Sequence, residues 1–190
     1  NLILFYLILA HLIGDFVLQP GKLIVWKNKS FVGVLVHVLI LLSLNFFLLV
    51  PYLSYQGLLI GLFVIYLIHF IEDVLKIEFV KKFPKYEFEA FIFDQAVHFS
   101  AIFVLYWYLI NLEPLLAGFE FLTRLYAFPG YVILAISIVL ASYTYDIVEY
   151  QIMRIKDKKC RYVRNYSGML IRSLIAVLIM LSVGFIIILL

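Results

Sequence analysis

Long apolar runs constrain this chain more than any other feature of its sequence. Six runs are long enough to cross a membrane as α-helices, at about residues 2–19, 31–50, 56–75, 89–111, 130–152 and 168–190. They lack the alternation of polar and apolar residues that marks the strands of a membrane barrel. The sequence therefore predicts an all-α, polytopic membrane protein in which six transmembrane helices form one domain over residues 1–190.

The composition excludes a soluble domain. Hydrophobic residues make up 66% of the chain and charged residues only 14%, whereas soluble proteins average about 45–50% and about 25%. The first run contains His11 and Asp15 and has no basic residue before it, so we expect a retained helix rather than a cleaved signal peptide. The expected partners are the lipid bilayer and a lipid or lipid-linked substrate, and no nucleic acid.

Basic residues gather on one side of the predicted membrane. Of the 15 Lys and Arg residues, 13 lie in or beside three connecting segments, at 20–30, 76–88 and 154–167. Arg124 lies in a connection on the opposite side, and Arg172 lies just inside the last run. Because basic connections stay in the cytoplasm, we expect a multi-pass protein of the inner or plasma membrane with cytoplasmic basic loops and both termini outside.

Pairs of His and Asp four residues apart recur inside the apolar runs. Side chains at this spacing lie one turn apart on the same face of a helix. Ionisable groups are costly within a membrane, so such pairs indicate a functional site. The pairs are His11 and Asp15, His69 and Asp73, and, in reversed order, Asp94 and His98.

The histidines also predict an internal repeat of two hairpins. His37 follows His11 by 26 residues across a basic loop, and His98 follows His69 by 29 residues across the next basic loop. Both hairpins run from outside to inside and back, which makes this a parallel repeat about an axis along the membrane normal. At 1.5 Å per helical residue, the polar groups lie within about 10–20 Å of a cytoplasmic Lys. We therefore expect one polar layer in the cytoplasmic leaflet.

This residue set is typical of a metal site. Imidazole and carboxylate groups are ligands for zinc, manganese and iron, and helix bundles present them at this spacing. A closed thiolate site is excluded because the only Cys, Cys160, lies in a basic segment. We predict a divalent metal cofactor of one or two ions, zinc first, with manganese or iron as alternatives. The expected ligands are His11, His37, His69, Asp73, Asp94 and His98.

Neighbouring polar residues receive supporting roles in this prediction. Asp15 and Asp73 are the expected catalytic carboxylates, each orienting a His or serving as a general base. Gln19 and Gln95 are expected to hydrogen-bond to the ligands instead of binding the metal. Glu72 adjoins Asp73 and is rotated by about 100° from it on a helix, so we expect Glu72 to face elsewhere.

Basic residues near the polar layer are candidates for binding a head group. Lys22, Lys76 and Arg154 lie at the cytoplasmic end of the predicted helices, where a phosphate group would enter. Within the first four runs, no Lys or Arg lies at the depth of the three Asp residues. An unpaired Asp at a helix centre costs roughly 2.5–3.5 kcal/mol, and a bound cation is the expected compensation.

Several of these motifs together resemble a known family. They are His11-Leu-Ile-Gly-Asp15-Phe-Val-Leu-Gln19, the Lys27 and Lys29 pair before His37, His69-x3-Asp73-x2-Lys76 and Asp94-Gln95-x2-His98. The family comprises multi-span membrane proteins of bacteria, archaea and phages, the domain-of-unknown-function family 3307, and the resemblance covers about the first 110 residues. It supports the candidate site residues and implies little about activity. The pattern is also similar in style to inner-membrane metal-dependent hydrolases, although it lacks their His-Arg and Thr-His-Ser signature.

Three functions are consistent with the pattern. The first is a metal-dependent intramembrane hydrolase that acts from the cytoplasmic leaflet on a lipid or lipid-linked, including phosphate-containing, substrate. The second is a transporter of divalent metal or protons through the same cluster, and the third is a non-catalytic structural or regulatory membrane module. A transporter also needs a polar path to the outer side, and the first four runs offer few such groups, namely Ser43, Asn45 and Asn111. The sequence therefore favours an enzyme or a binding site over a conduit.

Overall fold

The computed structural model describes residues 2–113, 126 and 128–189, with side chains described up to Ser182. The described residues form helices and connecting turns and no strand, which confirms the predicted all-α fold. The helices are α1 (Ile3–Leu12), α2 (Gly21–Lys27), α3 (Phe31–Leu48), α4 (Gln56–Lys82), α5 (Glu87–Leu109), α7 (Pro129–Val139), α8 (Tyr145–Lys156) and α9 (Tyr166–Leu189). Two π-helical turns, η1 (Ile13–Val17) and η4 (Leu140–Thr144), continue α1 and join α7 to α8, and short 3-10 turns cover Val50–Tyr52 and Pro84–Tyr86.

Most of these helices match the predicted membrane spans. Four helical segments are long and apolar enough to cross a membrane: α3, α4, α5 with the turn before it, and α7 continued through η4 into α8. A fifth span results if α1, η1 and α2 are counted together. The part of α9 with described side chains, Tyr166–Ser182, is apolar but shorter than a full span. The count of six spans therefore stays a prediction.

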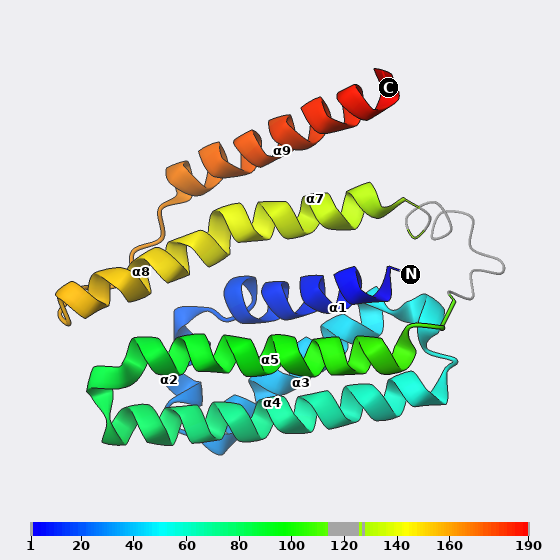
Figure 1. The fold of residues 1–190 in the computed structure, drawn as a ribbon. Helices are drawn as coiled ribbons and strands as arrows, with labels where there is room; N and C mark the ends of the chain where they lie inside the picture. The colour runs from blue at the N-terminus through cyan, green and yellow to red at the C-terminus, as the bar shows by residue number, and fades with distance from the viewer. Residues whose placement is uncertain (1, 114–125, 127, 190) are drawn as a thin grey trace.

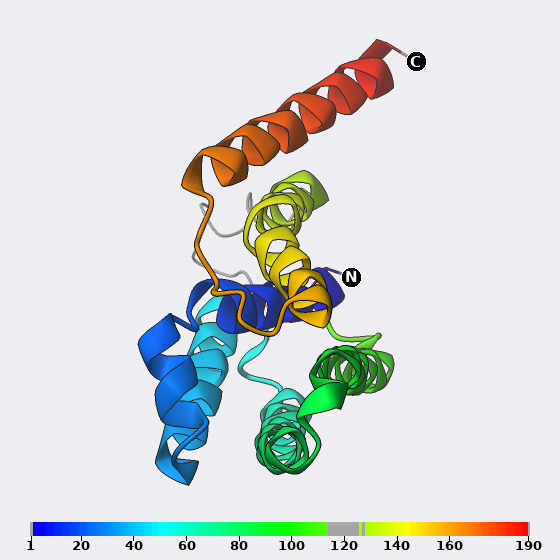
Figure 2. The same cartoon turned by 90° about the vertical axis from the view of Figure 1, so that its left-hand side faces the viewer.

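The bundle is built around α1. Figure 2 shows α1 in the middle of the assembly, where it packs on α3, α5 and α7. α4 and α5 form a closely packed antiparallel hairpin, α3 packs on α4, and α9 lies against α7 and η4 (Figure 1). Leu7, Leu41 and Leu62 are fully buried in the core, whereas Phe47 and Trp107 are largely exposed. Apolar side chains therefore cover the outside as well as the core, as expected for helices that face lipid.

The segment between the first two runs is helical where a basic loop was expected. Pro20 ends the first helix, and α2 begins at Gly21 with its axis bent by 91° from the preceding helix. Leu23 and Lys27, four residues apart, form its buried face. Ile24, Val25 and Trp26 are exposed on the other side. α2 therefore turns one basic side chain, Lys27, into the bundle.

Gly33 lets α2 lie against α3. A Cβ at Gly33 would lie 2.6 Å from both the carbonyl carbon of Trp26 and the backbone nitrogen of Lys27. Backbone atoms cannot rotate out of the way, so a methyl group there pushes the end of α2 outward. Ser30 starts α3 beside this contact, because its hydroxyl accepts a hydrogen bond from the Val32 amide at 3.1 Å.

Gly33→Ala is therefore expected to destabilise the protein by about 1–3 kcal/mol, the usual cost of overpacking a close contact. The measurement is the thermal unfolding of the purified protein in detergent. Gly21→Ala is the matched control, because a Cβ at Gly21 meets nothing within 4 Å. Equal melting temperatures for the two variants would contradict the close approach of α2 and α3.

The π-helical turn η4 anchors α9. Arg172 of α9 donates from Nε to the carbonyl oxygen of Ala141 at 2.7 Å, inside the turn where the regular hydrogen-bond ladder is interrupted. The Arg172 guanidinium also pairs with Asp146, which is buried. One polar side chain therefore attaches an otherwise apolar helix to the bundle.

The two predicted hairpin copies differ in their local structure. α4 is one helix of 27 residues, whereas the corresponding first helix changes to a π-helical turn at Ile13 and bends sharply into α2. The histidines of both hairpins nevertheless meet in one cluster, and the ring centroids of His11 and His69 are 6.1 Å apart. Superposition of the hairpins about a membrane-normal axis stays a prediction.

Candidate functional site

The seven His and Asp residues predicted to converge meet in the middle of the bundle. They come from four helical segments that are adjacent in space, and six of them are buried, whereas Asp15 is 11% exposed. They are His11 and Asp15 from α1 and η1, His37 from α3, His69 and Asp73 from α4, and Asp94 and His98 from α5.

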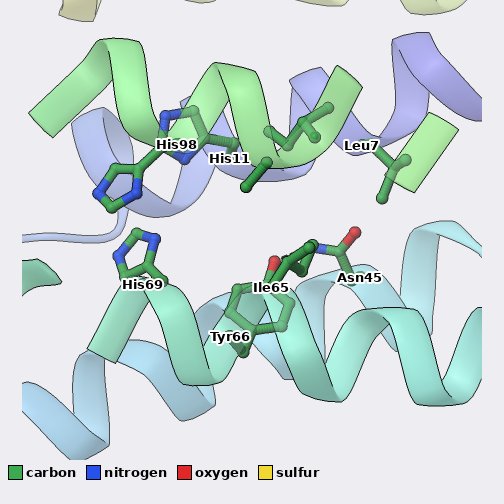
Figure 3. Close-up of a pocket in the computed structure, with 9 residues that line it drawn as sticks. Leu7, His11, Asn45, Ile65, Tyr66, His69 and His98 are labelled. Carbon is green, nitrogen blue, oxygen red and sulfur yellow. Dashed lines mark hydrogen bonds between the residues drawn. The ribbon is translucent and has the colours of Figure 1, made fainter. Parts of the chain in front are cut away.

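The imidazole rings form the centre of this cluster. The rings of His69 and His98 stack with centroids 3.9 Å apart, and His11 lies edge-on to His98 at 5.3 Å. Nε2 of His37 is 3.3 Å from Nε2 of His69. Figure 3 shows the rings of His11, His69 and His98 close together, with Tyr66 and Asn45 farther along the bundle. Four helices thus contribute to one layer of rings.

Lys27 neutralises Asp73, which corrects the sequence-based prediction. Its ammonium nitrogen lies 2.7 Å and 2.9 Å from the two carboxylate oxygens of Asp73. The two side chains are only 7% and 1% exposed. The expectation that no basic side chain reaches this depth was wrong, because α2 bends back and inserts Lys27 between the other helices.

Lys76 neutralises a second carboxylate. Its Nζ is 2.6 Å from Oδ2 of Asp94 and 3.4 Å from Oδ1 of Asp73. Lys76 was expected to hold a substrate head group, but its charge is already compensated inside the cluster. Removal of either partner of such a buried pair would leave an uncompensated charge.

Glu72 belongs to the cluster, which corrects a further expectation. Its Oε2 is 3.4 Å from Nε2 of His98. Glu72 lies three residues after His69, and this spacing places both on the same side of α4. Glu72 was expected to face away from the cluster, but α5 packs on α4 and contributes His98 beside it.

The two glutamines lie beside the predicted ligands. The Gln19 amide nitrogen is 3.2 Å from Nε2 of His37. The Gln95 amide donates to Oδ2 of Asp94 at 3.0 Å and to Oδ2 of Asp15 at 3.4 Å. These contacts are those expected of residues that orient ligands without binding the metal.

Three sets of described side chains bring ligand atoms within 4.8 Å of one another. The sets are Asp15, His69 and His98; His37, His69 and Asp73; and Glu72, Asp73, Asp94 and His98. Lysines already occupy Asp73 and Asp94, so only the first set is free of a lysine-paired carboxylate. His11 belongs to none of the three sets among the described residues. The first set contains two of the six expected ligands, His69 and His98, together with Asp15, which the sequence predicted as a catalytic carboxylate.

Unpartnered atoms in the first set fit a bound cation. Asp15 Oδ1 and His98 Nε2 are buried and lack a hydrogen-bond partner. His37 Nε2 lies 3.2 Å from Asp15 Oδ1, and Asp94 Oδ1 lies 3.1 Å from His98 Nε2, but neither contact is a hydrogen bond. Buried polar atoms are normally satisfied, so a ligand between these atoms would satisfy them.

The formal charge of the cluster also fits one divalent ion. Asp15, Glu72, Asp73 and Asp94 supply four carboxylates, and Lys27 and Lys76 supply two ammonium groups. With neutral histidines the ionised cluster carries a formal charge of −2. One divalent cation, or two protons, balances this charge, and a second metal ion would exceed it.

A cavity opens from the cluster toward the end of the bundle where the basic connections lie. Its volume is about 590 Å³, and Asp15, Lys76, Asp94 and Gln95 line its inner part. In Figure 1 the α4–α5 and α8–α9 connections lie at this end, opposite the beginning of α1 and the end of α9. The volume falls in the range of about 300–1,000 Å³ that is typical of small-molecule sites.

On the other side of the cluster, the described residues enclose a small cavity. This second cavity, of about 20 Å³, is lined by Leu7, Ile65 and Ile102 in addition to the histidines, and it holds about one water molecule. Asn45 and Tyr66 hydrogen-bond to each other beside it. Tyr66 is buried in the bundle.

The basic residues predicted to bind a head group lie in different places. Arg154 lines the large cavity and pairs with Glu87 through Nη1. Lys22 is exposed and is not among the residues that line the cavity. Arg164, to which the sequence assigned no role, also lines the cavity.

Comparison with known proteins identifies the family. The family model described as "Protein of unknown function (DUF3307)" matches residues 3–122, nearly two thirds of the chain. The chain belongs to this family. The match in this DUF3307 protein covers every residue of the cluster and ends before α7, α8 and α9. No curated protein and no solved structure matches the chain.

Proposed function

We propose that this DUF3307 protein is a metal-dependent intramembrane hydrolase. Its substrate is a lipid or a lipid-linked molecule that contains phosphate and enters from the cytoplasmic leaflet. The observation that carries the proposal is the set of Asp15, His69 and His98, two of whose ligand atoms are unpartnered, beside a cavity of about 590 Å³. Asp15 links the two features, because it belongs to the set and also lines the cavity.

Each residue of the cluster has a distinct role in this proposal. Asp15, His69 and His98 would hold one divalent ion, and an ion of this kind would supply a water with a pKa of about 7 as the nucleophile. Three protein ligands are the usual number in a catalytic zinc site. Zinc is the preferred ion, and manganese or iron are alternatives with the same ligand types.

The remaining groups orient the ligands and handle protons. His37 Nε2 lies 3.2 Å from Asp15 Oδ1, and its ring limits the positions that the carboxylate can take. Glu72 lies at contact distance from His98 and carries an unpartnered oxygen, so it is a candidate for accepting a proton. Asp73 is the weaker candidate base, because Lys27 contacts both of its oxygens.

The one-sided access favours an enzyme over a transporter. The large cavity reaches the cluster from the end with the basic connections, which we take as cytoplasmic by the positive-inside rule. Toward the opposite end, Leu7, Ile65 and Ile102 close the site around a volume of about 20 Å³. A conduit needs a continuous polar path, and a hydrolase needs only one opening.

Metal analysis of the purified wild-type protein tests this proposal. We expect about one equivalent of zinc, manganese or iron per chain, removable with a chelator and restored by the free ion. A preparation without metal that also fails to bind added zinc, manganese or iron would overturn the hydrolase. Two protons would then balance the formal charge of the cluster, and a proton relay through the histidines would replace the hydrolase as the proposed function.

A further inference from the structure

A group of polar side chains at the mouth of the large cavity takes no part in the metal cluster. Arg154 comes from α8, and Tyr162 and Arg164 come from the connection between α8 and α9. All three line the cavity that leads to Asp15 and Asp94. We call these three side chains the cavity rim.

The rim keeps unused hydrogen-bond donors. Arg154 pairs with Glu87 through Nη1, but its Nε is buried and lacks a hydrogen-bond partner. The hydroxyl of Tyr162 is also buried without a partner. Unsatisfied buried donors cost about 1–3 kcal/mol each, so a ligand that accepts hydrogen bonds at this place would be stabilised.

Arg164 adds a positive charge that the acidic side chains of the cavity do not take up. Its guanidinium carbon lies 5.2 Å from the centre of the Tyr143 ring, and this packing limits its movement. Of the acidic groups deeper in the cavity, Asp94 pairs with Lys76 and Asp15 lies 3.2 Å from His37, so neither contacts Arg164. Glu87 also lines the cavity, and it forms an ion pair with Arg154.

We propose that the cavity rim binds a phosphate monoester or diester group through Arg154, Tyr162 and Arg164. Arginine forks match phosphate oxygens geometrically and form charge-assisted hydrogen bonds with them. The assignment of this phosphate to the substrate rests on the proposed function. The scissile part then extends along the cavity toward Asp15, while Ile24, Ile77 and Phe91 contact its apolar part.

Arg164→Gln tests the rim directly. The protein in dodecyl maltoside micelles, which contain no phosphate, is titrated with short-chain phosphatidic acid in one arm and with inorganic phosphate in the other, and binding is followed by microscale thermophoresis. We expect wild type to bind phosphatidic acid and Arg164→Gln to bind it at least about tenfold more weakly, as for loss of a charge-assisted contact. Tighter binding of phosphatidic acid than of inorganic phosphate identifies a lipid head group; equal binding identifies free phosphate.

Arg161→Gln is the matched control. Arg161 lies in the same connection, is exposed and is not among the residues that line the cavity, so its variant should bind within about twofold of wild type. Tyr162→Phe removes only the hydroxyl and should weaken binding about three- to tenfold. This variant tests the rim if Arg164→Gln does not fold. Equal affinities of Arg164→Gln, Tyr162→Phe and Arg161→Gln, or no phosphate binding by wild type, would overturn the proposal.

Metal content separates this inference from the proposed function. Arg154, Tyr162 and Arg164 belong to none of the three ligand sets, so their variants should retain the wild-type amount of metal. Phosphate binding at the rim without any bound metal would refute the hydrolase and leave the rim intact. If the wild type and the rim variants bind metal, and the variants bind phosphate as tightly as wild type, only the proposed phosphate site at the rim would be refuted.

Discussion

Lys27→Met is expected to destabilise the protein by about 3–5 kcal/mol, because it leaves the buried carboxylate of Asp73 without the partner that contacts both of its oxygens. For a chain of this size, that loss corresponds to a melting temperature lower by roughly 6–20 °C. Thermal unfolding in detergent, followed by size-exclusion chromatography, measures the change. Met keeps most of the apolar length of Lys, so the variant removes mainly the charge.

Two further variants identify the cause. Lys29→Met lies in the same segment at an exposed position and should unfold like wild type. The double variant Lys27→Met/Asp73→Asn removes both charges and should recover at least half of the lost stability. If Lys27→Met melts like wild type, Lys27 does not compensate the charge of Asp73. A bound cation at Asp73 would then again be the expected compensation.

His69→Ala should lose metal binding by at least about 100-fold. His69 supplies one of the three atoms in the set with Asp15 and His98, and two ligands hold a divalent ion poorly. Isothermal titration of the metal-free protein with zinc measures the affinity. Hydrolytic activity toward a phosphate-containing lipid should fall together with metal content.

His11→Ala is the matched control for this experiment. The His11 ring lies in the same cluster, 5.3 Å from His98, but outside the three ligand sets. Its loss should lower the affinity for zinc by about tenfold, the lower end of the roughly 10- to 100-fold effect of residues that orient ligands. If His11→Ala and His69→Ala lose zinc equally, the metal lies closer to His11 than these contacts indicate.

The fold and most of the cluster followed from patterns that local physics controls. The helices could be predicted from apolar runs of spanning length, because such a run is a property of consecutive residues and does not depend on tertiary contacts. The i,i+4 spacing of His69 and Asp73 correctly predicted a shared face, and the common depth of these pairs correctly predicted that their four helical segments bring them together. Both conclusions needed no knowledge of which helices are neighbours.

The pairing of charges could not be predicted in this way. Lys27 lies in a segment interpreted as a loop, although Pro20 before Gly21 and the four-residue spacing from Leu23 to Lys27 are signs of a short helix with one buried face. The partner of Lys27 is 46 residues away in the sequence, and only the bend of 91° brings them together. Glu72 was predicted to face elsewhere because it is rotated by about 100° from Asp73. Its i,i+3 relation to His69, however, places it on the side of α4 that carries the histidine.

The bent helix α2 also has a consequence for how the chain is made. Synthesis proceeds from the N-terminus, so Lys27 is present before Asp73, and Asp15 is present before Gln95, which lies 80 residues later. A nascent chain that ends before α4 therefore carries an unpaired Lys27, and one that ends before α5 carries Lys76 without Asp94. Unpaired charges enter lipid at a high cost. We expect the first helices to remain beside the insertion machinery until α5 emerges, and then to move into the bilayer as one unit.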